Sequence, residues 1–195
     1  MPIYPDQQKR TSVTFSGREI DLANPKVSDV CIDDIAHSLA FQCRYGGHCR
    51  EFLSIAEHSV VVSLHVPQHL ALHGLLHDAA EAYVQDLTRP LRAIVGSIHI
   101  PLEDKWLAVL ESFFGMTGLV DMPAAVKAVD QSAIATEMRG NHAALPAWMK
   151  EIHDGYGYLT CPPWIDEHGY RSPLYWPPHT AEEKFLARFE ALTIG

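Results

Sequence analysis

The sequence of 195 residues lacks several features that mark whole classes of protein. It has no uncharged apolar run of ~18 residues, so we expect no transmembrane helix and no membrane partner. It is also poor in basic residues, because Lys plus Arg count 15 against 24 for Asp plus Glu, a formal net charge of −9. A protein that grips long DNA or RNA needs an excess of positive charge, so we expect no nucleic-acid partner.

Cysteine is scarce and is not spaced for a zinc ribbon. The chain has four cysteines, at positions 31, 43, 49 and 161, and none of them form a Cys-x-x-Cys pair. This pattern predicts reduced thiols rather than a disulfide framework. The first residues show no basic stretch followed by an apolar one, the mark of a secretory signal. We therefore expect a cytoplasmic protein.

The chain is rich in hydrophobic residues, at 47%, and most of them recur with a helical period. The pattern predicts helices over about 32–41, 55–66, 68–84, 102–114 and 123–138. Capping boxes at Ser54/Glu57 and Thr180/Glu183 predict two helix starts, the second for a last helix. A Ser-Gly turn at 16–17 indicates a small N-terminal β-hairpin. We expect an all-α single domain over 1–195, with 144–178, rich in Pro, Gly and aromatics, ordered but irregular.

Candidate metal ligands gather around a His-Asp pair in the expected third helix. His77 and Asp78 lie about 100° apart on a helix, so both can reach a cation between them. Glu81 follows one turn later. A single helix cannot close such a site, and His58 and Asp130 are candidates from other helices. Asp130 lies among apolar residues, where a carboxylate must be paired or bound to a metal.

Several common catalytic motifs are missing from the sequence. Gly74 follows His73 where a zinc protease would carry Glu. The GxSxG nucleophile elbow, the GxxxxGK[ST] phosphate loop and the Gly-rich dinucleotide fingerprint are also absent. These absences disfavour metalloprotease, serine-hydrolase and nucleotide-loop chemistries.

Four runs in order, EHS at 57–59, LLHDAAE at 75–81, DLTRP at 86–90 and VD at 129–130, resemble the motifs of HD-domain phosphohydrolases. The nearest branch holds 5′-deoxynucleotidases and phage-type deoxynucleotide phosphohydrolases. The likeness covers about half of the chain, from 44 to about 138. It implies an HD-domain helical bundle. It also implies a divalent ion (Mn, Co, Zn, Fe or Mg) whose ligands are His58, His77, Asp78 and Asp130.

The resemblance also implies roles for residues around that ion. Glu81 matches the acid that handles the attacking water, and Asp86 matches an acid near the phosphate. Arg44, Tyr45 and Arg92 match substrate contacts, although Tyr45 stands where this branch often has Trp. His69 and His73 have no counterpart, so we expect them to have surface or packing roles. The implied partners are a small nucleotide and further copies of the chain, as a homodimer or larger oligomer.

The function that follows is hydrolysis of a deoxynucleoside monophosphate to the deoxynucleoside and phosphate. One alternative is a triphosphohydrolase that removes tripolyphosphate from a deoxynucleotide such as dATP. Another is a non-catalytic helical module with a structural metal.

A (p)ppGpp hydrolase is disfavoured because Ala82, not Asp, follows Glu81. A cyclic-dinucleotide phosphodiesterase is disfavoured because GYG, not GYP, stands at 155–157, far from the His-Asp pair. The acidic balance is compatible with a mononucleotide, which needs only local positive charge.

Overall fold

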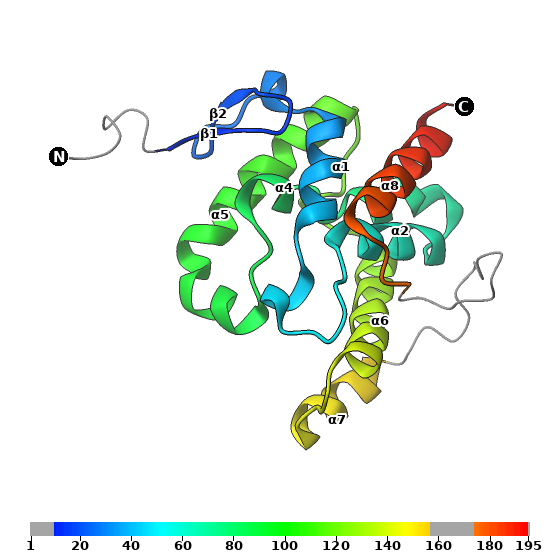
Figure 1. The fold of residues 1–195 in the computed structure, drawn as a ribbon. Coiled ribbons are helices and arrows are strands. Elements are labelled where there is room, and N and C mark those ends of the chain that lie inside the picture. Colours follow the sequence, from blue (N-terminus) through cyan, green and yellow to red (C-terminus); the bar gives the residue numbers. More distant parts are fainter. Residues whose placement is uncertain (1–9, 157–173, 195) are drawn as a thin grey trace.

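The computed structural model describes residues 10–156 and 174–194, and this part of the chain is mostly helical with one small hairpin (Figure 1). Strands β1 (Thr11–Val13) and β2 (Glu19–Asp21) pair antiparallel, with Ser12 opposite Ile20. Gly17 takes a φ of 83° in the turn, a conformation that glycine adopts at little cost. The expected all-α class with an N-terminal hairpin is therefore confirmed.

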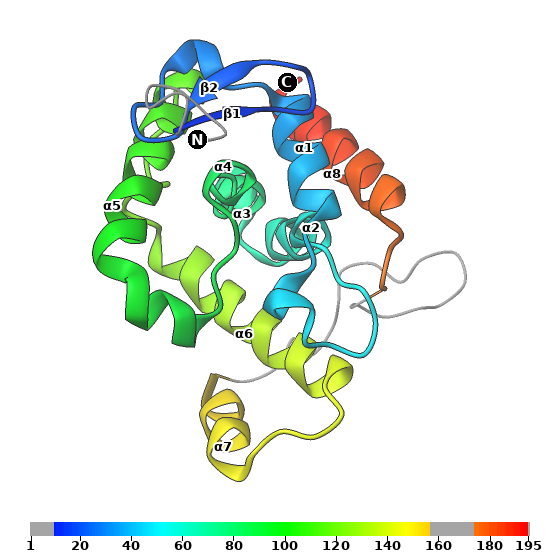
Figure 2. The same ribbon diagram turned by 60° about the vertical axis from the view of Figure 1, so that its left-hand side comes forward.

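The helices surround a short central pair. Figure 2 shows α3 (Ala71–Leu76) and α4 (Glu81–Val84) almost end-on, with α1 (Ile32–Phe41), α2 (Ile55–His65), α5 (Arg89–Phe114) and α6 (Ala124–Asn141) around them. Helix α8 (Pro178–Thr193) packs on α1 and α2, and α7 (Ala147–Tyr156) extends from α6. Short 3-10 turns cover Val27–Asp29, Arg44–Gly47 and Gln68–Leu70. No helix in the described ranges is both long and apolar enough to cross a membrane.

The core lies where α1, α2, α3, α4, α5 and α8 meet. Trp106 and Phe185 are fully buried there, and Trp106 stacks on Tyr83 with ring centroids 3.8 Å apart. Gly74 lets α3 approach α2 closely, because a Cβ at this position would lie 2.9 Å from Ser63 Cα. This close approach brings the turn after α3, which carries the His-Asp pair, beside the first turns of α2.

The expected continuous helix over 68–84 is wrong, because it is interrupted between α3 and α4. Through this interruption the backbone bonds run from residue i to i−3, as in Ala79 N–H to Leu76 O (3.0 Å) and Glu81 N–H to Asp78 O (3.0 Å). The chain keeps turning in a helical sense but is wound more tightly. His77 and Asp78 therefore occupy a turn between two short helices.

Other predicted boundaries also need correction. Helix α5 begins at Arg89 rather than near 102, with Pro90 in its first turn and Pro101 inside it. Segment 144–178 is not wholly irregular, since it contains α7, where Trp148 is 61% exposed; residues 157–173 of that segment lie outside the described residues. Helix α8 starts at Pro178, so Thr180 lies inside the helix and not at its cap.

Candidate metal centre

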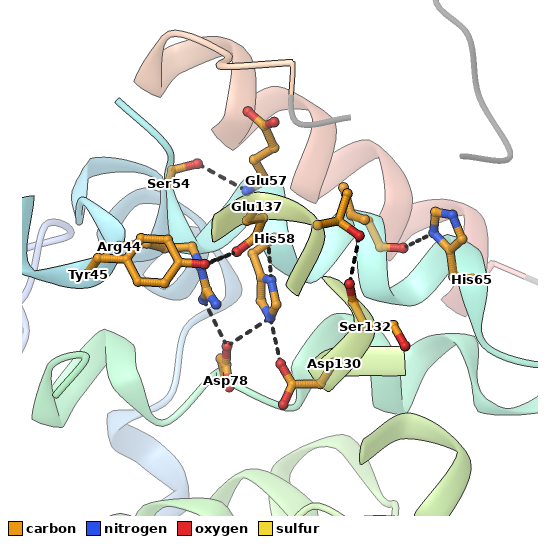
Figure 3. A network of polar contacts seen from close by, with 12 residues as sticks. Arg44, Tyr45, Ser54, Glu57, His58, His65, Asp78, Asp130, Ser132 and Glu137 are labelled. Atoms are coloured by element: carbon orange, nitrogen blue, oxygen red, sulfur yellow. Dashed lines mark hydrogen bonds and ion pairs between the residues drawn. The ribbon is translucent and has the colours of Figure 1, made fainter. Parts of the chain in front are cut away.

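Three side chains from three elements form a group that could hold a metal ion. One ligand atom each from His58 (α2), His77 (after α3) and Asp130 (α6) lies within 4.8 Å of the others. His58 Nε2 is 3.1 Å and His77 Nε2 is 3.8 Å from Asp130 Oδ1. Asp78 Oδ2 completes the cluster, at 3.7 Å from His58 Nε2 and 3.2 Å from His77 Nε2. Figure 3 shows His58, Asp78 and Asp130 turned toward a common point.

Both imidazoles are oriented by their other ring nitrogen. His58 Nδ1 lies 2.7 Å from Glu137 Oε1, and His77 Nδ1 donates to the Gly74 carbonyl at 2.8 Å. Each of these contacts turns Nε2 toward the cluster, as the outer partners of metal-binding histidines commonly do. Among the described residues, buried His77 Nε2 has no well-formed hydrogen bond. An inward-facing ring nitrogen of this kind suits a ligand for a cation.

The electrostatics of the cluster favour positive charge. Burial and Arg44 disfavour protonation of His58, but Glu137 and Asp130 outweigh them and raise its pKa. Burial likewise opposes protonation of His77, yet Asp78 and Asp130 hold its pKa well above the usual value. Burial acts against ionisation of Asp130, but the hydrogen bond with His58 and the nearby charges of both histidines lower its pKa strongly. A bound cation would compete for the place of these protons.

Glu137 on α6 is the main site residue that sequence reasoning missed. It is 3% exposed and accepts from three side chains: Oε1 faces His58, while Oε2 receives Arg44 Nε at 3.0 Å and Tyr45 Oη at 2.6 Å. Burial opposes its ionisation, but the charges of Arg44 and His58 prevail and lower its pKa. One sequence signal was present, because Glu137 stands seven residues after Asp130 and so shares its face of the helix.

Arg44 and Tyr45 belong to the turn Arg44–Gly47, and Figure 3 shows both side chains beside His58 and Glu137. Arg44 is buried, and one of its terminal nitrogens lies 3.7 Å from Asp78 Oδ2. Tyr45 has φ 59° and ψ 24°, a left-handed conformation that is costly for a side-chain-bearing residue. Its hydrogen bond to Glu137 holds it there, so the ring is fixed in place relative to the cluster.

Glu81 and Asp86 form an acidic pair beside the cluster. Burial and the nearby charges of Asp78 and Asp86 hold the pKa of Glu81 well above its usual value. Burial and Asp78 also raise the pKa of Asp86, despite the opposing charge of Arg44. Within the described part of the chain, Glu81 Oε2 is buried without a hydrogen bond. Asp86 follows Gln85, whose φ of 72° and ψ of 150° are a rare backbone combination at the end of α4.

Arg92, an expected substrate contact, turns instead to its own helix. Arg92 and Glu103 form an ion pair at 2.6 Å, and His99 Nδ1 lies 3.8 Å from the same Glu103 oxygen. In a straight α-helix, the Cα atoms of Arg92 and Glu103, eleven residues apart, would be separated by about 16 Å. Figure 2 shows that α5 bends sharply along its length, and this bend brings Arg92 and Glu103 together; Pro101 lies inside the helix, between them in sequence.

Glu57, next to His58, anchors a distant part of the chain. Ser54 Oγ accepts from Glu57 N–H at 3.0 Å, so half of the expected capping box forms. The Glu57 carboxylate does not accept the backbone N–H of Ser54, which would be the other half of the capping box. It accepts the backbone N–H groups of Leu174, Tyr175 and Trp176 at 2.6, 3.1 and 2.7 Å. The residue that precedes a cluster histidine therefore fixes the chain that leads into α8.

No family model matches the chain. It is 39% identical over 126 residues to the uncharacterized protein YfdR of Escherichia coli (strain K12), an alignment that covers 65% of this chain and 69% of YfdR. It is 35% identical over 127 residues to the uncharacterized protein RCAP_rcc00048 of Rhodobacter capsulatus, covering 60% of this chain and 65% of that protein. Identity of this degree over more than two thirds of YfdR shows that the chain belongs to the same family as YfdR.

Proposed function

We propose that this protein is a metal-dependent phosphohydrolase of the HD-domain type that cleaves the phosphate ester of deoxynucleoside monophosphates. The observation that carries the proposal is the approach of His58, His77, Asp78 and Asp130 from α2, the α3–α4 turn and α6. Two imidazoles and two carboxylates are a donor set for borderline divalent cations such as Mn, Co, Zn or Fe, and also admit Mg. The inward Nε2 atoms and raised histidine pKa values support this use.

A divalent ion bound there would lower the pKa of water and neutralise charge on a phosphoryl group. The surrounding residues have complementary roles. Glu81, with a raised pKa and a buried free oxygen in the described structure, is suited to take a proton from the attacking water. Asp86 is suited to give a proton to the leaving nucleoside oxygen, since burial keeps its pKa high. Arg44, buried beside Asp78, would stabilise the equatorial phosphoryl oxygens.

One observation favours a monophosphate over a triphosphate. Arg92, which would have extended the positive charge beyond Arg44, is paired with Glu103 at 2.6 Å. A tripolyphosphate carries several more charges than a monophosphate and needs cations along its length. With Arg92 neutralised, the described site suits one phosphoryl group better than three.

Metal removal and replacement tests this function directly. The protein is stripped with a chelator, reloaded with Mn²⁺, Co²⁺, Zn²⁺ or Mg²⁺, and assayed against the deoxynucleoside mono- and triphosphates. We expect metal-dependent release of inorganic phosphate from at least one monophosphate. Release of tripolyphosphate from a triphosphate would instead indicate the triphosphohydrolase.

A purely structural metal is distinguished by stability. A structural site ties metal loss to unfolding, whereas a catalytic site loses activity first. Thermal melts of the stripped and reloaded protein are compared with phosphate release on the same samples. A large fall in melting temperature with no activity under any metal would overturn the proposal.

A further inference from the structure

Two cysteines lie in contact at the base of the loop that carries Arg44 and Tyr45. Cys43 Sγ and Cys49 Sγ are 3.6 Å apart and both are partly exposed. They are the residues that precede and follow the loop segment 44–48. Their spacing in sequence matches no common cysteine motif, so only the fold brings them together.

The backbone of the loop is anchored at both ends, the Arg44 and Tyr45 side chains bond to Glu137, and two glycines follow Tyr45. Arg44 N–H bonds to Leu53 O at 2.9 Å, and Arg50 N–H bonds to Asn141 O at 2.8 Å. Gly46 and Gly47 lie between these anchors with φ of 60° and 79°, where glycine costs little. The sulfurs need to close from 3.6 Å to the ~2.05 Å of a disulfide. Rotation of the two side chains, with adjustment in the glycine pair, can supply this movement.

We propose that Cys43 and Cys49 are a reversible oxidation site that forms an intramolecular disulfide in response to a peroxide. The Cys43 sulfur attacks one oxygen of hydrogen peroxide, the O–O bond breaks, and Cys43 sulfenic acid and water form. The Cys49 sulfur then attacks the Cys43 sulfur, the S–O bond breaks, and a second water leaves. In total two thiols are oxidised, one peroxide is reduced, and a dithiol reductant reverses the change.

The surroundings set the order of the two steps. Burial and the adjacent Cys43 thiol raise the pKa of Cys49 to about 11, so Cys49 is a poor first nucleophile at neutral pH. Cys43 is therefore assigned as the residue that meets the peroxide, and Cys49 as the one that resolves the sulfenic acid. The contact between the sulfurs makes resolution faster than further oxidation of Cys43.

Closure of this loop bears on the proposed active site, and this part rests on the proposed function. Arg44 and Tyr45 lie inside the ring that the disulfide closes, whereas the four candidate metal ligands lie outside it. We expect oxidation to raise the KM for the nucleotide several-fold and to leave the bound metal in place. An unchanged KM in the fully oxidised protein would overturn this link but not the disulfide itself.

Peptide mapping tests the disulfide without any activity assay. Trypsin cuts after Lys26, Arg44 and Arg50, so Cys43 lies in peptide 27–44 and Cys49 in peptide 45–50. Because Cys31 shares peptide 27–44, the experiment uses the full chain with Cys31→Ser. After mild hydrogen peroxide, we expect the intact mass to be lower by ~2 Da before blocking, and the two peptides to be joined in a digest made after free thiols are blocked. Dithiothreitol should separate them.

Single substitutions complete the test. In Cys31→Ser/Cys49→Ser, Cys43 should stop at sulfenic acid or go on to sulfinic acid, with no joined peptide. In Cys31→Ser/Cys43→Ser, no joined peptide should form under the same dose. Alkylation of both thiols to the same extent before and after peroxide would overturn the proposal. So would joining of either peptide to the one that contains Cys161.

Discussion

Glu137 Oε1 lies 2.7 Å from His58 Nδ1, deep beneath the candidate metal centre. The same carboxylate holds Arg44 and Tyr45 through its other oxygen. One buried side chain thus sets the orientation of a metal-ligand candidate and of two substrate-contact candidates. The arrangement joins the metal centre and the substrate loop into one hydrogen-bonded unit.

Glu137→Gln should weaken metal binding without removing any ligand. An amide has one acceptor oxygen and one donor nitrogen, so it must place an N–H against His58, Arg44 or Tyr45. Loss of an outer carboxylate of this kind typically lowers metal affinity by ~10–100-fold. Titration with Mn²⁺ or Zn²⁺ by calorimetry measures it, with Glu190→Gln, exposed on α8, as control. Equal affinities in the two variants would contradict the role of Glu137.

His77→Ala and Asp130→Asn should each abolish stoichiometric metal binding. Either change removes one donor from a cluster whose atoms lie within 4.8 Å of each other. His73→Ala is the matched control, because His73 precedes His77 by four residues and bonds to the Thr117 carbonyl at 2.8 Å instead. Metal content after dialysis is measured by elemental analysis. Full occupancy in His77→Ala would show that the ion binds elsewhere.

Sequence reasoning found the cluster residues because their motifs are local. His77 and Asp78 are adjacent, and His58 and Asp130 each sit in a helix that its own period predicts. The Arg92–Glu103 ion pair could not be predicted from the sequence, because it depends on the bend of α5. The role of Glu137 was equally hidden, since its partners stand 79 to 93 positions away in the chain.

The break between α3 and α4 shows a second limit. The segment 68–84 has a helical period throughout, and helical turning does continue across it. Hydrophobic spacing does not distinguish an i to i−4 from an i to i−3 bond over one turn. The interruption between α3 and α4 could therefore be found only in the structure.

Glu81→Gln should leave metal binding intact and slow phosphate release by ~10²–10⁴-fold, the usual loss of acid–base help. Burial, Asp78 and Asp86 raise the pKa of Glu81. Below that pKa the carboxyl keeps its proton and cannot accept another. The wild-type rate should therefore rise with pH through a pKa above the usual glutamate value of 4.5. This rise should vanish in Glu81→Gln.

The pH–rate profile is measured at saturating metal, with Glu51→Gln as an exposed control. A parallel metal titration shows whether Glu81 is also a ligand. Loss of metal together with activity would move Glu81 from proton transfer to coordination. A wild-type profile with no rise above ordinary carboxyl values would contradict its assignment as the base.

Glu57→Ala should destabilise the fold, because it leaves the N–H groups of Leu174, Tyr175 and Trp176 without their acceptor. Leaving buried donors unpaired costs about 1–3 kcal/mol each in the free energy of unfolding, less where water replaces the carboxylate.

Burial raises the folded-state pKa of Glu57 to about 7, from 4.5 when exposed. A raised pKa means that folding favours the protonated form. This contribution is complete below pH 4.5 and is lost as pH rises through about 7. Urea melts at several pH values should therefore show the deficit of Glu57→Ala shrinking toward alkaline pH, and a deficit that grows instead would show that the carboxylate is the stabilising form.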